Sequence, residues 1–269
     1  MPFLEIRGAK LHYTDDGSGP ETIVFSHGLL FSGKMFAAQV EALKSDYRCI
    51  TFDHRGQGQS AVTPSGYDME DLAKDARALI NQLDIGSCHF VGLSMGGFVG
   101  MRLAARHPGL IRSLTIIDSS ADPEPEENHG RYRLLNFVAR WFGLGVVAGR
   151  VMPILFGQSF LDDPAKAEDR KYWRAQITGA DRMGITRAVA GVIERQGVID
   201  EIGSIACPTL VLVGDEDVAT VPEKSKRIEA AIPGAKLVII AKAGHSSTIE
   251  QPDKVTAEMR RFLDQAANG

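Results

Sequence analysis

The chain has 269 residues, of which 44% are apolar and 24% are charged, and its formal net charge is −4 at pH 7. This composition is typical of a globular protein with one substantial core, and it lacks the basic footprint of a nucleic-acid-binding protein. No apolar run reaches membrane-spanning length, and residues 1–7 do not resemble the start of a signal peptide, so we expect a soluble, cytoplasmic protein without membrane or nucleic-acid partners.

The three cysteines are expected to be free. Cys49, Cys88 and Cys207 fall in or beside runs that favour strands, and no Cys-x-x-Cys spacing occurs. We therefore interpret them as small buried apolar side chains in a reducing compartment rather than as disulfides or metal ligands.

The first strands lead to a candidate binding loop. Short runs at 3–7 and 10–14 predict an opening hairpin, and the β-prone run 22–26 ends in His27-Gly28-Leu29. A glycine in this place lets the next backbone N–H turn inward, so the N–H of Leu29 is a candidate half of an oxyanion hole. We expect His27 to order the loop rather than to exchange protons.

The next segment alternates helix, strand, loop and helix. A helix is predicted at 34–43, a strand at 48–52 and a second helix at 68–83, for which Asp68 offers an N-cap. Between them lies Asp53-His54-Arg55-Gly56-Gln57-Gly58-Gln59-Ser60, which lacks the lysine of a phosphate loop and the glycine spacing of a dinucleotide site. It is interpreted as a loop braced by Asp53 and Arg55.

A tight glycine-rich turn follows the strand predicted at 88–91. Its sequence, Gly92-Leu93-Ser94-Met95-Gly96-Gly97, leads into a helix-forming run at 98–107. Read as Gly-x-Ser-x-Gly, it predicts a nucleophile elbow that holds Ser94 in a strained conformation at a helix N-terminus, where an oxyanion is favoured. The alternative is a glycine-rich turn in which the serine only caps the helix.

The remaining chain predicts a sheet interrupted by helices. The strand at 111–118 continues the alternation of strands and helices, which favours a mostly parallel sheet covered on both faces. No convincing strand occurs in 121–202, so we expect an α/β core at 1–120 and 203–269 with a helical cap, or lid, at 121–202.

The cap is rich in aromatic and aliphatic residues, which predict an apolar acyl or alcohol pocket unless they fill the cap's own core. Its arginines could bind an acidic substrate, but we expect each to be a solvated helix residue. Those arginines are Arg131, Arg133, Arg140, Arg174, Arg182 and Arg187.

The last strands place an acid and then a histidine. A strand at 209–214 is followed by acidic residues 215–217, and a strand at 236–240 leads to His245. Because the carboxyl ends of neighbouring parallel strands lie at one edge of a sheet, the serine, an acid and the histidine are expected to meet there, in the chain order of a Ser, Asp, His triad.

These features together resemble the α/β-hydrolase superfamily over essentially the whole chain. The matching motifs are His27-Gly28, residues 53–60, residues 92–97, Gly214-Asp215-Glu216-Asp217 and Gly244-His245. The resemblance implies an eight-stranded, mostly parallel sheet, and it implies Asp217 rather than Asp215 as the acid.

Within the superfamily the chain is most similar to small bacterial carboxylesterases, aryl esterases with perhydrolase activity and 3-oxoadipate enol-lactonases. The turn at 92–97 and the ending 243–252 are closest to the enol-lactonases. Ser94 stands where haloalkane dehalogenases and epoxide hydrolases have aspartate, and Leu93 stands where C–C bond hydrolases usually have asparagine.

The implied chemistry is cleavage of a small ester or lactone through an acyl-enzyme, without a metal or an organic cofactor. Ser94 is the nucleophile, His245 the base and Asp217 its partner, while the N–H groups of Leu29 and Met95 form the oxyanion hole. Because His245 must be neutral to accept a proton, activity is expected to fall below about pH 6.5.

Three alternatives stay open at this point. Asp118, after the preceding strand, could replace Asp217 as the acid. The chain could also be a slow-turnover ligand receptor on the same fold, or a scaffold protein in which the motifs are relics.

Overall fold

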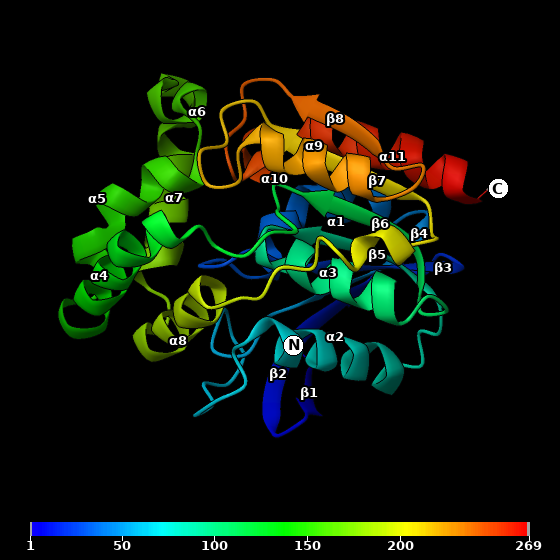
Figure 1. The fold of residues 1–269 in the computed structure, drawn as a ribbon, viewed down its shortest axis with the longest axis horizontal. Coiled ribbons are helices and arrows are strands. Elements are labelled where there is room, and N and C mark those ends of the chain that lie inside the picture. The colour runs from blue at the N-terminus through cyan, green and yellow to red at the C-terminus, as the bar shows by residue number, and fades with distance from the viewer. Residues whose placement is uncertain (1, 268–269) are drawn as a thin grey trace.

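The computed structural model describes residues 2–267 and is built around an eight-stranded sheet (Figure 1). The strands are β1 (Phe3–Ile6), β2 (Ala9–Asp16), β3 (Glu21–Ser26), β4 (Tyr47–Phe52), β5 (Cys88–Leu93), β6 (Ile111–Ile117), β7 (Thr209–Gly214) and β8 (Lys236–Ile240). Their order is β1-β2-β4-β3-β5-β6-β7-β8, and only the pairs formed by β2 are antiparallel. The predicted mostly parallel sheet is confirmed.

Helices cover both faces of this sheet (Figure 1). They are α1 (Ala37–Leu43), α2 (Met69–Gln82), α3 (Met95–Arg106), α9 (Pro222–Ala231), α10 (Ser247–Glu250) and α11 (Pro252–Ala267). Helices α2, α3 and α9 pack on one face, and α1 and α11 on the other. In β3 the side chain of Val24 packs on the face covered by α2, α3 and α9, whereas Ile23 and Phe25 pack on the face covered by α1 and α11. Successive strand residues point to opposite faces of a sheet.

Two helix starts differ from the sequence prediction, and one further helix was not predicted. The segment predicted to begin at Lys34 opens as a 3-10 turn, η1 (Gly33–Phe36), before α1. Helix α3 begins at Met95, directly after the serine, since the glycines that follow let it lie close to β3. Helix α11 was not predicted, and it buries Val255, Met259 and Leu263.

Five helices separate β6 from β7, and we call them the cap helices. They are α4 (Glu126–Phe142), α5 (Leu144–Leu155), α6 (Gln158–Asp162), α7 (Ala167–Thr178) and α8 (Arg182–Ile193), with short 3-10 turns η2 (Pro164–Lys166) and, just after the cap, η3 (Ile202–Ser204). They gather at one end of the sheet, at the left of Figure 1. Residues 121–202 contain no strand, as expected.

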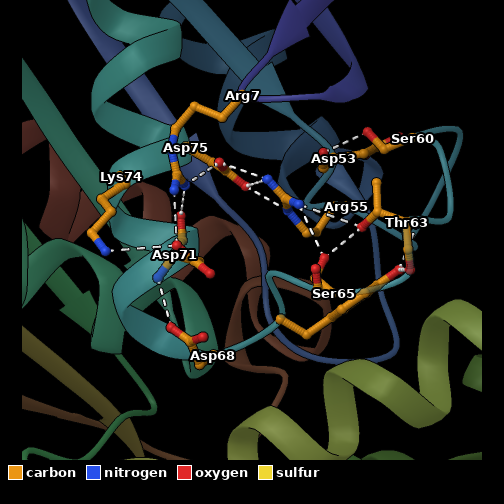
Figure 2. A network of polar contacts seen from close by, with 11 residues as sticks. Arg7, Asp53, Arg55, Ser60, Thr63, Ser65, Asp68, Asp71, Lys74 and Asp75 are labelled. Atoms are coloured by element: carbon orange, nitrogen blue, oxygen red, sulfur yellow. Dashed lines mark hydrogen bonds and ion pairs between the residues drawn. The ribbon is translucent and has the colours of Figure 1, made fainter.

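The loop after β4 is held by the two residues predicted to brace it. Asp53 accepts hydrogen bonds from the backbone of Gly33 at 2.8 Å and of Gln59 at 2.9 Å. Arg55 forms a two-pronged contact with the buried carboxylate of Asp75, which Arg7 approaches from the opposite side at 2.9 Å (Figure 2). The loop is therefore fixed both to the segment that begins at Gly33 and to helix α2.

The cysteines are free, with Cys49 and Cys88 buried and Cys207 half-buried. Within residues 2–267, no helix is long and apolar enough to cross a lipid bilayer.

Candidate active site

Ser94 lies in the strained turn between β5 and α3. Its backbone has φ 51° and ψ −111°, a left-handed conformation that is costly for a residue with a side chain. A Cβ atom on Gly92 would lie 2.2 Å from the carbonyl oxygen of Gly96, and one on Gly96 would lie 1.9 Å from that of Ser26. The two glycines are therefore required by close approach, as a nucleophile elbow demands.

His245 and Asp217 meet Ser94 at the carboxyl ends of three strands. The Nε2 atom of His245 lies 2.9 Å from the Oγ of Ser94, and its Nδ1 atom lies 2.9 Å from the Oδ2 of Asp217. Ser94 follows β5, Asp217 follows β7 and His245 follows β8. All three residues are at least nine-tenths buried. The structure thus brings together the three residues that the sequence singled out.

Thr220, which the sequence analysis missed, fixes the Asp217 carboxylate. Its hydroxyl donates to Oδ2 at 2.7 Å, and the N–H groups of Ala219 and Thr220 donate to Oδ1 at 2.8 and 2.9 Å. One oxygen of the carboxylate is therefore held by the backbone, and the other faces His245.

The pKa values of this pair move in opposite directions. Burial alone would raise the pKa of Asp217, but the charge of His245 and the donated hydrogen bonds outweigh it and hold the pKa below its ordinary value. Burial alone would lower the pKa of His245, but the charge and hydrogen bond of Asp217 raise it above 6.5. The pair therefore favours a charged imidazole beside a charged carboxylate.

Asp118 occupies a different place from the one expected of an alternative acid. Its Oδ1 accepts from the N–H of Gly214 at 2.9 Å, and its Oδ2 accepts from the N–H and hydroxyl of Ser247 at 3.1 and 2.6 Å. No hydrogen bond joins it to His245 among the described residues. Complete burial, followed by the nearby charge of Asp217, raises its pKa to about 7. Asp118 thus holds the histidine loop rather than the imidazole.

Of the two residues proposed for an oxyanion hole, one shares a cavity with Ser94 and the other directly follows it in the chain. Leu29 lines the same cavity as Ser94, and its N–H makes no hydrogen bond within residues 2–267, whereas the N–H of Leu30 donates to the Oε1 of Gln57 at 2.9 Å. Met95 is the first residue of α3, and the amide nitrogen of Gln57 lies 3.8 Å from its sulfur. Gln57, not recognised from sequence, contacts both sides of the site.

Glu250 is a second residue that the sequence analysis missed. It is 3% exposed, and it accepts the N–H groups of Gly157 in the cap and of Gly244 and Ser246 around His245, at 2.8, 3.0 and 3.1 Å. Burial raises its pKa to about 7 in spite of these three bonds. It joins the cap to the loop that carries His245.

His27 has the ordering role expected of it. Its Nδ1 donates to the carbonyl of Gly28 at 2.7 Å, and its Nε2 accepts the N–H of His54 at 2.9 Å. Both ring nitrogens are occupied by backbone groups, and burial lowers the pKa of His27. The ring is therefore a neutral link between two loops.

A cavity opens above Ser94 between the core and the cap helices. Its wall includes Ser94 and His245 and is otherwise mostly apolar, with contributions from Leu135, Ala139, Leu144, Val147, Val151, Ile154, Leu155, Ile185, Val189, Val192 and Ile193. Part of the apolar cap surface thus lines a pocket, as predicted. Another part does not, because Trp141 and Phe142 are 65% and 68% exposed.

None of the cap arginines named from the sequence lines this cavity. Arg131, Arg133, Arg174 and Arg182 are exposed, as expected. Instead the lining includes Arg195, just after α8, which was not considered.

Comparison with known proteins places the chain in a known fold family. The family model described as alpha/beta hydrolase fold matches residues 21–252. The "Putative carbamate hydrolase RutD" of Pseudomonas syringae pv. syringae (strain B728a) is 30% identical over 261 residues, which cover 94% of this chain and 97% of that protein.

Two solved structures are similar over nearly the whole chain. A thermophilic esterase from Thermogutta terrifontis has a TM-score of 0.92 and 32% identity, with 99% of each chain covered. The enol-lactonase from Burkholderia xenovorans LB400 has a TM-score of 0.91 and 30% identity, with 98% of this chain and 100% of that chain covered.

Proposed function

The chain belongs to the α/β hydrolase fold family, and from this membership we propose that it is a serine hydrolase that cleaves carboxylic esters or lactones through an acyl-enzyme. The observation that carries the proposal is the continuous series of hydrogen bonds from Ser94 through His245 to Asp217. Ser94 and His245 also line a mostly apolar cavity. A hydrolase is the activity that the family and the relatives support.

In the proposed reaction His245 takes the proton of the Ser94 hydroxyl as its oxygen attacks the carbonyl carbon. Asp217 holds the imidazole with Nε2 toward the serine and stabilises its positive charge. The N–H groups of Leu29 and Met95 receive the negative charge that develops on the carbonyl oxygen. His245 then returns the proton to the departing alkoxide, and water attacks the acyl-enzyme in the same manner.

The cap helices supply most of the apolar wall, so we propose that residues 121–202 act as a cap that selects the substrate while the core performs the chemistry. Esters and lactones present the same planar carbonyl and a similar leaving oxygen to Ser94. The similarity to the enol-lactonase favours lactones as a second substrate class, and that to RutD favours carbamates.

A substrate panel with the wild-type protein and Ser94→Ala tests the proposal. We expect wild type to hydrolyse p-nitrophenyl butyrate and Ser94→Ala to lose that activity by a factor of about 10⁴ or more, with an unchanged circular dichroism spectrum. Unchanged turnover in Ser94→Ala would refute the assignment. Including γ-butyrolactone and a p-nitrophenyl carbamate in the panel separates the three substrate classes.

A further inference from the structure

The cavity above Ser94 has a polar strip in its mostly apolar wall. We give this name to Tyr132, Asn136 and Arg195, all of which line the cavity. Tyr132 and Asn136 lie one turn apart on α4 and therefore share a face of that helix. Arg195 follows α8, which packs against α4.

Arg195 lines the same cavity as the nucleophile and shares a neighbour with it. The centre of its guanidinium group is 4.5 Å from the centre of the Phe98 ring, and Phe98 is one helical turn beyond Ser94, to whose carbonyl its N–H donates at 3.1 Å. Phe98 also lines the cavity. Phe98 therefore contacts both the guanidinium, through its ring, and the serine, through its backbone.

The positive charge of Arg195 is already balanced. Its Nη1 donates to the carboxylate of Glu124 at 2.8 Å and to the carbonyl of Val192 at 2.9 Å, and its Nε donates to the carbonyl of Asp122 at 3.2 Å. Arg195 is 5% exposed, so this ion pair is shielded from water. An anionic ligand here would face the Glu124 carboxylate, which lines the same cavity, in a poorly solvated site.

Polar atoms of the strip have no partner within residues 2–267. The Nη2 of Arg195 and the hydroxyl of Tyr132 make no hydrogen bond there. Asn136 donates through its amide nitrogen to the carbonyl of Thr186 at 3.0 Å, but its Oδ1 is buried and unpaired. Since buried polar groups are nearly always hydrogen-bonded, the buried Oδ1 of Asn136 is an acceptor that a suitable ligand would satisfy, and Tyr132 and Arg195 offer unused donors beside it.

We propose that the polar strip recognises a neutral hydrogen-bonding group, a ketone or a hydroxyl, several carbon atoms from the scissile carbonyl. The inference rests on the proposed esterase function and narrows its substrates to oxo- or hydroxy-substituted esters. Tyr132 and Arg195 donate to the oxygen of that group, and a hydroxyl can also donate to Asn136. The apolar wall around the strip binds the carbon chain.

Matched ester pairs test this inference on either side of the scissile bond. The acyl pair is p-nitrophenyl 5-oxohexanoate and p-nitrophenyl hexanoate, and the alcohol pair is 5-oxohexyl acetate and hexyl acetate. We expect wild type to prefer the oxo ester of at least one pair by about five- to tenfold in kcat/KM, the effect of one added hydrogen bond.

The variant Tyr132→Phe removes one donor without changing the size of the side chain. We expect it to lower the preference ratio by about five- to tenfold, whereas the matched control Tyr172→Phe, which changes an exposed cap tyrosine, leaves the ratio unchanged. A ratio that stays the same in Tyr132→Phe, or a wild type without preference in either pair, would overturn the inference. A preference for the anionic p-nitrophenyl ester of adipic acid over the oxo ester would overturn it as well.

The outcome is distinguishable from failure of the proposed function. If wild type hydrolyses all these esters through Ser94 without discriminating between them, only the role of the polar strip is wrong. If wild type hydrolyses none of them, the ester assignment is wrong and the inference falls with it.

Discussion

Asp118 and Ser247 are joined by two hydrogen bonds, from the backbone N–H and the hydroxyl of the serine, which end on the same carboxylate oxygen. Ser247 stands two residues after His245, so this contact fixes the loop that carries the imidazole. Asp217, by contrast, binds the imidazole itself at 2.9 Å. Two buried aspartates therefore stand near one histidine with different partners.

This difference predicts unequal effects for two matched substitutions. Asp217→Asn should lower kcat for p-nitrophenyl butyrate by about 10⁴-fold, because an amide cannot hold the imidazole in the required tautomer. Asp118→Asn should lower kcat by less than about tenfold and should mainly lower the free energy of unfolding, by about 1–3 kcal/mol, because one of its accepted N–H groups loses its partner. The reverse order of kcat values would assign the acid to Asp118.

The pH dependence of kcat/KM should have its acid limb above pH 6.5. Since the pKa of His245 is raised, the imidazole loses its proton only at a higher pH than an ordinary histidine, and the protonated ring cannot act as a base. The pH below which activity falls is therefore expected to lie above the value of about 6.5 that the sequence alone predicted. A profile from pH 5 to 9 checks this, and a midpoint below 6.5 would contradict it.

Asp118→Asn provides a second test in the same profile. The charge of Asp118 contributes to the raised pKa of His245, so its removal should shift the acid limb toward lower pH. A limb that does not move would mean that the two groups are not coupled.

Gln57→Leu should lower kcat by about ten- to a hundredfold with little change in KM. The substitution leaves the N–H of Leu30 without its partner and lets the neighbouring N–H of Leu29 move from the position where the oxyanion forms. Steady-state kinetics with p-nitrophenyl butyrate measures the effect. Gln82→Leu, at an exposed position at the end of α2, is the matched control, and an equal loss in that variant would contradict the explanation.

Glu250→Gln should destabilise the protein more at pH 5 than at pH 8. The pKa of Glu250 is about 7 in the folded protein and lies near 4.5 when unfolded, so its contribution to stability is complete below pH 4.5 and is lost as the pH rises through 7. Glutamine cannot accept at both former carboxylate oxygens, so we expect a loss of about 1–3 kcal/mol at pH 5.

Urea unfolding at the two pH values measures this difference, with the exposed Glu223→Gln as control. A larger loss at pH 8 than at pH 5 would contradict the assignment of the raised pKa to Glu250.

The sequence predicted those parts of the site that depend on short local patterns. Ser94 is marked by its glycines and His245 by its place after a strand, and the parallel sheet was enough to expect both beside an acid from residues 215–217. The choice of Asp217 within that segment came from the family resemblance. Glu250 could not be found in this way, because the N–H of Gly157 that it binds is 93 residues away and only tertiary packing brings the two together.

The sequence also did not show which side of each cap helix faces the cavity. Helix α4 carries large apolar side chains on more than one side, so its periodicity did not distinguish Leu135, which lines the cavity, from Trp141, which is exposed. Arg195 was overlooked because it lies in the segment between α8 and the next strand, where no pattern marks it as buried.

The placement of the cap between β6 and β7 puts the catalytic residues and most of the pocket wall on separate stretches of the chain. Ser94, Asp217 and His245 all come from the ends of core strands, and the helices α4 to α8 contribute none of them. Exchange of this one continuous stretch for that of a relative can therefore alter which compounds are admitted while leaving the reacting groups in place. A chimera joined between β6 and α4 and between α8 and β7 would take its catalytic residues from one parent and its substrate specificity from the other.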